Sequence, residues 1–440
     1  MTGRSTKGLA KRRHRLGLAS WCLYDWANSA FPTIITTFVF SVYFTQMVAE
    51  NPVQGSAQWS YSVAGAALIV AMGAPALGAI ADRMGRRKPW LLSFTILTMI
   101  CTAGLWWIKP SPQFAIPALL LYAAGAASFG FAMIFYDAML RSIAPPGHIG
   151  RLSGWGWSLG YVGGLLCLII ALFVFLRAGP PPFGLSQAED EPVRATALLV
   201  VLWFAIFAVP IFVFTPDRRA TGTTLHQAVK GGASGLVQSL RAIFRHRGMA
   251  RFLIAHMFYT NGINTLFSFG GIYAAGTFGL SLDQVLYFGI LLNVTAALGA
   301  AAFSWLDDGV GSKITILLAL CGLSVLGLAL VLIESQTWFF VLGSLLGLFV
   351  GPAQSAGRSM MARLAPQAFE TQAFGLYELS GKVTIFAGPL VLGLATSLFQ
   401  SQRIGMSTIL IFFVLGALIL LRVQEPDTPP PTGSGAARPN

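Results

Sequence analysis

Long apolar segments alternate with short polar segments along almost the whole chain. Twelve of the apolar segments approach or exceed the roughly 20 residues that a helix needs to cross a bilayer. They cover residues 16–47, 59–81, 90–108, 114–140, 152–176, 195–214, 252–277, 284–306, 314–333, 338–362, 372–399 and 406–421. The pattern therefore predicts an all-α, polytopic membrane protein with twelve transmembrane helices.

The second half of the chain repeats features of the first half. Asp308 to Lys313 is a weakened copy of Asp82 to Lys88, and Ala365-Pro366 with Gly375 repeats Ala144-Pro145 with Gly154. Such duplication is typical of transporters built from two pseudo-symmetric six-helix bundles. We predict a basic N-terminus (1–15), a first bundle (16–215), a linker (216–247), a second bundle (248–423) and a Pro-rich, disordered tail (424–440).

The linker contains a short apolar pattern of its own. Basic residues flank five apolar residues that recur there at helical spacing. The apolar residues are Leu236, Val237, Leu240, Ile243 and Phe244. This pattern predicts an amphipathic helix, which either lies on the inner leaflet or packs on the base of the bundles.

Composition agrees with a membrane protein and places the positive charge on one side. The chain has 440 residues, of which 55% are hydrophobic and 10% charged, and its net charge is +13. Only four basic residues fall in the loops on the predicted outer side: Lys109, Arg177, Arg194 and Arg403. The charge therefore reflects orientation rather than nucleic-acid binding, and it predicts that both termini are cytoplasmic. If the source is bacterial, the membrane is the inner or plasma membrane.

The cysteines and the N-terminus do not change the prediction of a membrane protein. Cys22, Cys101, Cys167 and Cys321 each lie in a separate apolar segment, so we expect packing residues rather than disulfides or a metal site. The basic N-terminus precedes a segment that is too long for a cleavable signal peptide.

The loop from Gly78 to Lys88 combines glycine, aspartate and arginine between two apolar segments. It resembles the signature loop between the second and third helices of the major facilitator superfamily, and this resemblance implies the major facilitator fold. It also implies a gating latch that joins the two halves in one of the alternating states. The residues we assign to this latch are Gly78, Asp82, Arg83, Gly85, Arg86, Arg87, Asp137 and Asp308, with Asp137 expected to pair with Arg83 or Arg86.

A second resemblance is more specific. The segment Tyr24-Asp25-Trp26-Ala27-Asn28-Ser29-Ala30 is similar to the hallmark of the vacuole-effluxer-like family, which includes the fungal exporter of vacuolar amino acids linked to autophagy. Gly271 to Ala274, Arg358 to Pro366 and Phe374 to Lys382 resemble the same family. Members often carry aspartate before the glycine of the seventh span, whereas this chain has Asn261 before Gly262. The resemblance implies export of a solute.

Polar residues form a layer near the middle of the predicted spans. At 1.5 Å per residue, Asp25 lies roughly 13 Å past Leu16 and Asn28 roughly 18 Å past it. The candidates for substrate binding or coupling are Tyr24, Trp26, Asp25, Asn28, Asn261, Asn264, Asn293, Glu378 and Lys382. Two alternatives stay open: Glu378 and Lys382 can simply neutralise each other at i,i+4, and Asp25 can serve only as a hydrogen-bond acceptor in packing.

These residues favour secondary transport over other functions. Neither a nucleophile with its base nor a phosphate-binding loop occurs in the sequence, so we expect no enzyme, cofactor or metal. The mixed charges of the layer fit a zwitterion, its carboxylate toward Lys382 and its ammonium toward Asp25. We therefore expect a monomeric, lipid-embedded exporter of neutral amino acids or small peptides, with protons coupled through Asp25 or Glu378. The alternatives are transport of a cationic or drug-like solute and a receptor on the same fold.

Overall fold

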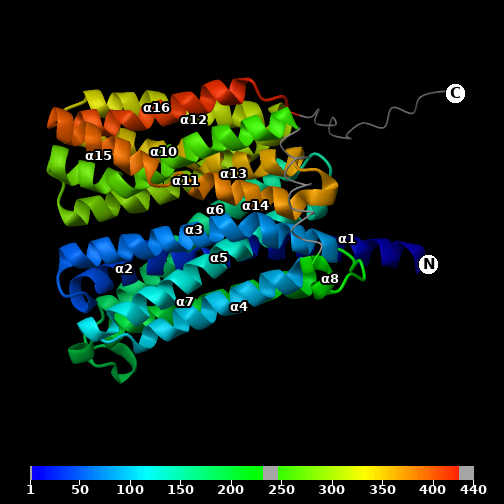
Figure 1. The fold of residues 1–440 in the computed structure, drawn as a ribbon, viewed down its shortest axis with the longest axis horizontal. Helices are drawn as coiled ribbons and strands as arrows, with labels where there is room; N and C mark the ends of the chain where they lie inside the picture. Colours follow the sequence, from blue (N-terminus) through cyan, green and yellow to red (C-terminus); the bar gives the residue numbers. More distant parts are fainter. Residues whose placement is uncertain (1, 231–245, 426–440) are drawn as a thin grey trace.

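The computed structural model describes residues 2–230 and 246–425, and it is helical throughout these ranges (Figure 1). Eleven helical segments are long and apolar enough to cross a membrane. The helix α10, which is 32 residues long but more polar, runs beside them at the place of the seventh predicted span. The fold class is therefore an all-helical, polytopic membrane protein.

The first half holds six spans. They are α1 (Thr2–Asn28) continuing through η1 (Phe31–Phe38), α2 (Phe40–Tyr43) and η2 (Phe44–Val48); α3 (Pro52–Met84); α4 (Lys88–Gly104) with η3 (Leu105–Trp107); η4 (Pro112–Phe114) with α5 (Ala115–Ile143); α6 (Ile149–Ile170) with η5 (Ala171–Leu176); and α7 (Glu191–Phe214). The short helices η6 (Pro182–Gly184) and η7 (Gln187–Glu189) precede α7, and α8 (Leu225–Lys230) follows it.

The second half has the same plan. Its spans are α10 (Arg247–Phe278), α11 (Leu282–Val310), α12 (Ser312–Leu332), α13 (Gln336–Leu364), η8 (Gln367–Phe369) with α14 (Glu370–Lys382) and α15 (Ala387–Phe399), and α16 (Gln402–Leu421). Local sequence sets several boundaries. Asn51 caps α3 and Ser281 caps α11 in a capping box, while Gly85 and Gly311 end these helices at φ of 83° and 98°.

The two halves lie side by side with parallel long axes (Figure 1). The start of α1 and the end of α16 lie at the same end of the molecule, which we call the terminal face. The halves meet where α3 crosses α14 and where α6 crosses α11. A Cβ added at Gly78 would stand 2.6 Å from Cα of Gln372, so this crossing depends on glycine.

Two predicted spans are not continuous helices. The first changes from α-helix to π-helix after Asn28, close to Pro32, which has no N–H to donate. The eleventh is broken between α14 and α15 at residues 383–386. The amphipathic pattern of the linker and residues 426–440 of the tail lie outside the described residues.

Candidate functional site

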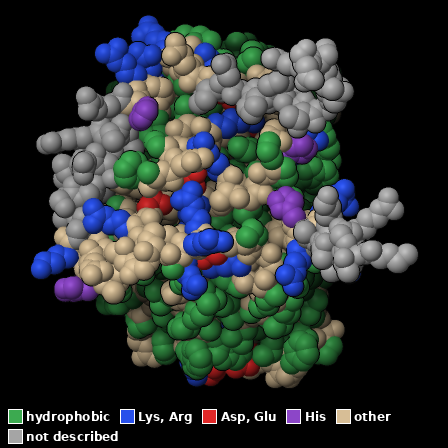
Figure 2. Space-filling view, turned by 90° about the vertical axis from the view of Figure 1, so that its right-hand side faces the viewer, with side chains coloured by type: hydrophobic (Ala, Val, Ile, Leu, Met, Phe, Trp, Pro, Cys, Tyr) green, Lys and Arg blue, Asp and Glu red, His purple; other side chains and the backbone are tan. Residues whose placement is uncertain are grey.

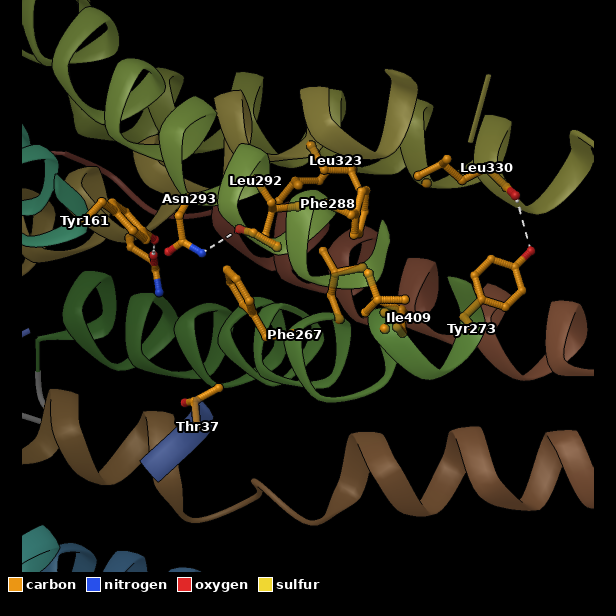
Figure 3. A pocket seen from close by; sticks show the side chains of 18 of the residues that line it. Thr37, Tyr161, Phe267, Tyr273, Phe288, Leu292, Asn293, Leu323, Leu330 and Ile409 are labelled. Atoms are coloured by element: carbon orange, nitrogen blue, oxygen red, sulfur yellow. Dashed lines mark hydrogen bonds between the residues drawn. The ribbon is translucent and has the colours of Figure 1, made fainter. Parts of the chain in front are cut away.

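A cavity of about 410 Å³ lies among helices of both halves (Figure 3). Its walls are mainly apolar and aromatic, with Phe267, Phe288, Leu292 and Ile409 between its two ends. The polar groups that line it are neutral: Ser29, Thr33, Thr37, Trp157, Tyr161, Tyr273, Asn293 and Gln354. No charged side chain is among the described residues of this lining. The cavity therefore fits a solute with a large apolar part and few polar groups.

One end of the cavity is more polar than the rest. The Tyr161 hydroxyl donates to Oε1 of Gln354, and Nδ2 of Asn293 donates to the Gly289 carbonyl at 2.8 Å. Trp157 stands beside Tyr161, and its indole Nε1–H is buried without an acceptor in the described structure. A buried donor without a partner at the wall of a cavity is suited to an acceptor on a ligand.

A charged cluster lies next to this polar end and joins the two halves. Arg358 of α13 is 1% exposed, and its Nη1 lies 2.9 Å from Oδ2 of Asp25 on α1 and 3.2 Å from Oδ1 of Asp137 on α5. Its Nε and Nη2 donate to the hydroxyl and the carbonyl of Ser153 on α6, at 2.9 and 2.7 Å. We call Asp25, Asp137 and Arg358 the buried triad.

Aromatic rings enclose the triad. The Arg358 guanidinium lies 4.8 Å from the Trp21 ring, and 5.6 Å from each of the Tyr136 and Trp157 rings. Trp21 and Tyr136 stack at 4.5 Å. Because Trp157 also lines the cavity, a single side chain separates a bound solute from Arg358.

The neighbours of Asp25 in the hallmark segment have structural partners. Tyr24 is buried and shares a hydrogen bond of 2.7 Å with Thr95. Trp26 stacks on Trp203 at 5.7 Å, and Nδ2 of Asn28 lies 3.3 Å from Oδ1 of Asp25. None of Tyr24, Asp25, Trp26 and Asn28 lines the cavity.

The candidates of the second half are also dispersed. Asn293 lines the cavity, whereas Asn264 lies half-buried on α10. Nζ of Lys382 lies 2.6 Å from Oε2 of Glu378, which confirms the local pair. His256 is buried, and its Nδ1 shares a hydrogen bond of 2.7 Å with the Ser380 hydroxyl.

Asn261 stabilises the break in the eleventh span. Its Oδ1 accepts from the Gly388 N–H at 3.0 Å, and its Nδ2 donates to the Thr384 carbonyl. A break inside a membrane span leaves backbone groups without helical partners. The Asn261 amide supplies an acceptor for the Gly388 N–H and a second donor to the Thr384 carbonyl, which also accepts from the Ala387 N–H.

We expect Asn261→Ala to lower the stability of the protein. The buried Gly388 N–H loses its acceptor, at a cost of about 1–3 kcal/mol, while the Thr384 carbonyl keeps the Ala387 N–H as a donor. The apparent melting temperature in detergent measures the effect. Asn264→Ala, on the same helix, is the matched control, because the Asn264 side chain makes no hydrogen bond among the described residues. Equal shifts in the two variants would contradict the assignment.

On the terminal face, the loop between α3 and α4 holds the start of α14. The Asp82 carboxylate accepts from the Thr371 and Gln372 N–H groups at 3.1 and 2.9 Å, and lies 3.8 Å from Arg87. Burial lowers the pKa of the Arg87 guanidinium, and the charge of Glu370 opposes this shift.

Glu370 is the centre of this charged cluster. Its carboxylate lies 2.9 Å from Arg87, 2.7 Å from Arg218 and 3.8 Å from Arg141. Figure 2 shows the surrounding terminal face, on which Lys and Arg side chains gather. Arg86 is exposed on this face, and the Arg83 carbonyl accepts from Thr221.

The second half carries a mirrored latch. The Asp308 carboxylate accepts from the Gly150 and Arg151 N–H groups at 2.7 and 3.2 Å, so it caps α6 as Asp82 caps α14. Each of the two caps reaches from one half to the other. Arg363 lies 2.8 Å from Asp307 and 3.6 Å from Asp308.

Two further carboxylates cap helices within their own halves. Asp217, after α7, accepts from the Arg87 and Lys88 N–H groups at 3.0 and 3.2 Å. Glu425, after α16, accepts from the Ser312 and Lys313 N–H groups at 2.8 and 2.9 Å, and it lies 2.9 Å from Arg363. Glu425 was assigned to the disordered tail, but this carboxylate is part of the folded terminal face.

The structure corrects the predicted partner of Asp137. Asp137 does not pair with Arg83 or Arg86 but with Arg358. The Asp137 side chain is buried, whereas Arg83 lies in the last turn of α3 and Arg86 is exposed in the loop that follows. Sequence reasoning also missed Arg358, Arg363 and Glu370 as site residues. An arginine inside the tenth predicted span was the available signal for Arg358, since a charge within a span needs a buried partner.

Comparison with known proteins identifies the family. The family model described as "Vacuole effluxer Atg22 like" matches residues 56–427. The chain belongs to this family.

Relatives of this Atg22-like protein occur in bacteria and fungi. It is 29% identical over 415 residues to the MFS-type transporter YxiO of Bacillus subtilis (strain 168), itself uncharacterized, with 92% of this chain and 94% of YxiO covered. It is 22% identical over 306 residues to Autophagy-related protein 22 of Yarrowia lipolytica, with 62% of this chain and 51% of that protein covered. The chain thus matches about half the length of this fungal relative.

Solved structures establish the fold. The proton:xylose symporter XylE superposes with a TM-score of 0.75 at 15% identity, covering 94% of this chain and 97% of XylE. The human organic anion transporter MFSD10 superposes with a TM-score of 0.73 at 17% identity, covering 92% of this chain and 99% of MFSD10. The Atg22-like protein therefore has the major facilitator fold, and it is an integral, multi-pass secondary transporter of the MFS rather than an enzyme.

Proposed function

We propose that this Atg22-like transporter exports small, neutral organic solutes with a large apolar part, in particular neutral amino acids or small peptides. The observation that carries the proposal is the lining of the cavity, which combines apolar and aromatic walls with neutral polar groups at one end. A solute with a net charge would lose its hydration there without gaining an opposite charge. A zwitterion is neutral overall, and its apolar side chain fits the walls.

The polar end offers partners for both charged groups of a zwitterion. The Trp157 Nε1–H is buried and has no acceptor among the described residues, and we propose that it donates to a carboxylate when the ring turns toward the solute. The Gln354 carbonyl oxygen is the proposed acceptor for an ammonium group. This differs from the pairing with Lys382 and Asp25 predicted from sequence. Lys382 is neutralised by Glu378 and Asp25 by Arg358, and neither lines the cavity.

Transport by alternating access follows from the position of the latches. The caps at Asp82 and Asp308 hold the halves together at the terminal face, while the cavity reaches Leu330 and Phe339 near the opposite helix ends. We propose that the terminal face is cytoplasmic, because Lys and Arg gather on it. The proton symport by XylE supports protons as the coupling ion.

A binding comparison tests the substrate class. Leucine is expected to bind the purified protein more tightly than leucinamide or 4-methylpentanoate, because each of these lacks one charged end. Isothermal titration or a thermal shift measures the affinities. Equal affinity for the three compounds, or no binding of leucine, would overturn the zwitterion assignment.

A matched pair of variants locates the site. Gln354→Leu removes the acceptor proposed for the ammonium group and should weaken leucine binding about tenfold, the effect of one hydrogen bond of about 1.4 kcal/mol. Trp155→Phe changes an exposed aromatic residue of α6 that does not line the cavity, and it should leave leucine binding unchanged. Exchange of labelled leucine across proteoliposomes separates a transporter of this substrate from a receptor, which binds without exchange.

A further inference from the structure

The buried triad joins the two halves through one arginine, and its charges do not balance. We propose that Asp137 is the residue that binds the coupling proton, and that this proton loosens the contact between the halves. The proposal rests on the proton-coupled transport proposed above, and it assigns the coupling site to a residue that the sequence indicated only as part of the latch.

The charge count at this depth calls for one proton. Three carboxylates lie in the buried layer, namely Asp25, Asp137 and Glu378, and they face two cations, Arg358 and Lys382. Glu378 and Lys382 neutralise each other on α14. Arg358 is then shared by two carboxylates, so the triad carries one excess negative charge in a buried site. Two carboxylates at one cation favour the binding of a proton to one of them.

The hydrogen bonds select Asp137 rather than Asp25. The Asp25 carboxylate accepts from Arg358 at 2.9 Å and from the Asn28 amide at 3.3 Å. The Asp137 carboxylate accepts from Arg358 alone among the described residues, at the longer distance of 3.2 Å. Donors stabilise the ionised form of a carboxylate, so the charge on Asp137 is the less stabilised of the two.

The other cations near Asp137 have other partners. Arg141, one turn along α5, lies 3.8 Å from Glu370 and donates to the Ala365 carbonyl. Asp25 from α1 and Glu378 from α14 add negative charge near Asp137, and Arg358 from α13 is the cation. Tyr377 of α14 is neutral and buried. On α6, the residue that contacts the triad is Ser153, which is also neutral. On the α4 side, Arg87 is directed to Glu370, Thr371 and the Ala138 carbonyl.

Protonation changes the strength of the contact between the halves. Arg358 belongs to the second half, whereas Asp25, Asp137 and Ser153 belong to the first. The terminal face can open only if this contact separates. When Asp137 takes up a proton and forms its O–H bond, Arg358 keeps one charged partner instead of two, so separation becomes easier. Loss of the proton restores the second charge and favours closure.

The triad also lies close enough to the cavity to respond to a solute. The Trp157 ring contacts the cavity on one side and lies 5.6 Å from the Arg358 guanidinium on the other. A solute that bonds Trp157 Nε1 therefore acts on the wall of the proton site. This arrangement provides a short physical link between solute binding and proton binding.

Infrared difference spectroscopy tests the assignment without any substrate. Between pH 5.5 and pH 9, exposed carboxylates stay mostly ionised, so a protonated carboxyl band that titrates in this range reports a buried group. Other buried carboxylates, such as Asp307, can add to this band, so the variants are compared with the unmodified protein. We expect one component of the band in the unmodified protein and in Glu378→Gln, and its loss in Asp137→Asn. Asp137→Glu should keep this component at a shifted frequency, which shows that a folded site is being observed. Absence of a titrating band in the unmodified protein, an unchanged band in Asp137→Asn or loss of the same component in Glu378→Gln would overturn the proposal.

A distance measurement tests the mechanical consequence. Spin labels attached through His226→Cys and Ala368→Cys lie on exposed positions of the two halves at the terminal face, with Cys321→Ser removing the exposed native thiol. The fraction of long distances should rise as the pH falls, and it should be high and independent of pH in Asp137→Asn. A pH-independent distribution in the unmodified protein would overturn the proposal. Because neither measurement uses a solute, leucine binding can fail while this assignment stands.

Discussion

Replacing Arg358 with methionine is expected to destabilise the protein by about 3–5 kcal/mol, the usual cost of removing one partner from a buried ion pair. The substitution keeps a long side chain, so little volume is lost. It leaves Asp25 and Asp137 close together without a cation, and it also removes the donors to Ser153. We expect a large fall in the apparent melting temperature in detergent and a smaller yield of monodisperse protein.

Two comparisons separate charge from packing. Arg219→Met removes an exposed arginine of the terminal face and should leave the melting temperature nearly unchanged. Combining Arg358→Met with Asp25→Asn and Asp137→Asn removes all charges of the triad and should recover most of the lost stability. If Arg358→Met is as stable as Arg219→Met, the triad does not hold the halves together.

The second large effect is expected at the latches. Asp82→Asn removes the charge that accepts from two backbone N–H groups of α14, and Asp308→Asn does the same at α6. A hydrogen bond to a charged group contributes about 1.5–3 kcal/mol, so the closed terminal face should lose about 10- to 150-fold in relative population. Solute exchange in proteoliposomes should fall while the amount of protein in the membrane stays near normal.

The spin-label distances at residues 226 and 368 check this effect directly. Each variant should populate the long distances at a pH at which the unmodified protein is closed. Arg219→Gln, which changes a charge on the same face without touching a cap, serves as the control. An unchanged distance distribution and an unchanged exchange rate in Asp82→Asn would show that the cap does not control closure.

The sequence predicts contacts that are local along the chain better than contacts between helices. Eleven of the twelve predicted spans are confirmed by apolar length, and the Glu378–Lys382 pair, one of the alternatives that helical periodicity offers, is present. Arg358 and Asp25 are 333 residues apart in sequence, and no periodicity relates them. Their pairing depends on how the two halves meet, which one sequence read alone does not determine.

The break in the eleventh span shows a similar limit. Residues 372–399 form one apolar segment and were predicted as one span, although Pro389 has no N–H for the carbonyl of Ile385, which lies in the break at residues 383–386. The amide that stabilises this break comes from Asn261 on another helix. Asn261 was singled out as a midplane polar residue, but its role depends on its neighbour in space.

The cap formed by Glu425 limits how the chain can be shortened or tagged. This carboxylate holds the first backbone N–H groups of α12 and pairs with Arg363, although it comes only a few residues after the last span. A shortened protein that ends before Glu425 would lose the cap together with the tail, whereas one that ends just after it would keep the terminal face intact. Affinity tags and fluorescent partners should therefore be joined beyond Glu425, through a linker long enough to leave this side chain in place.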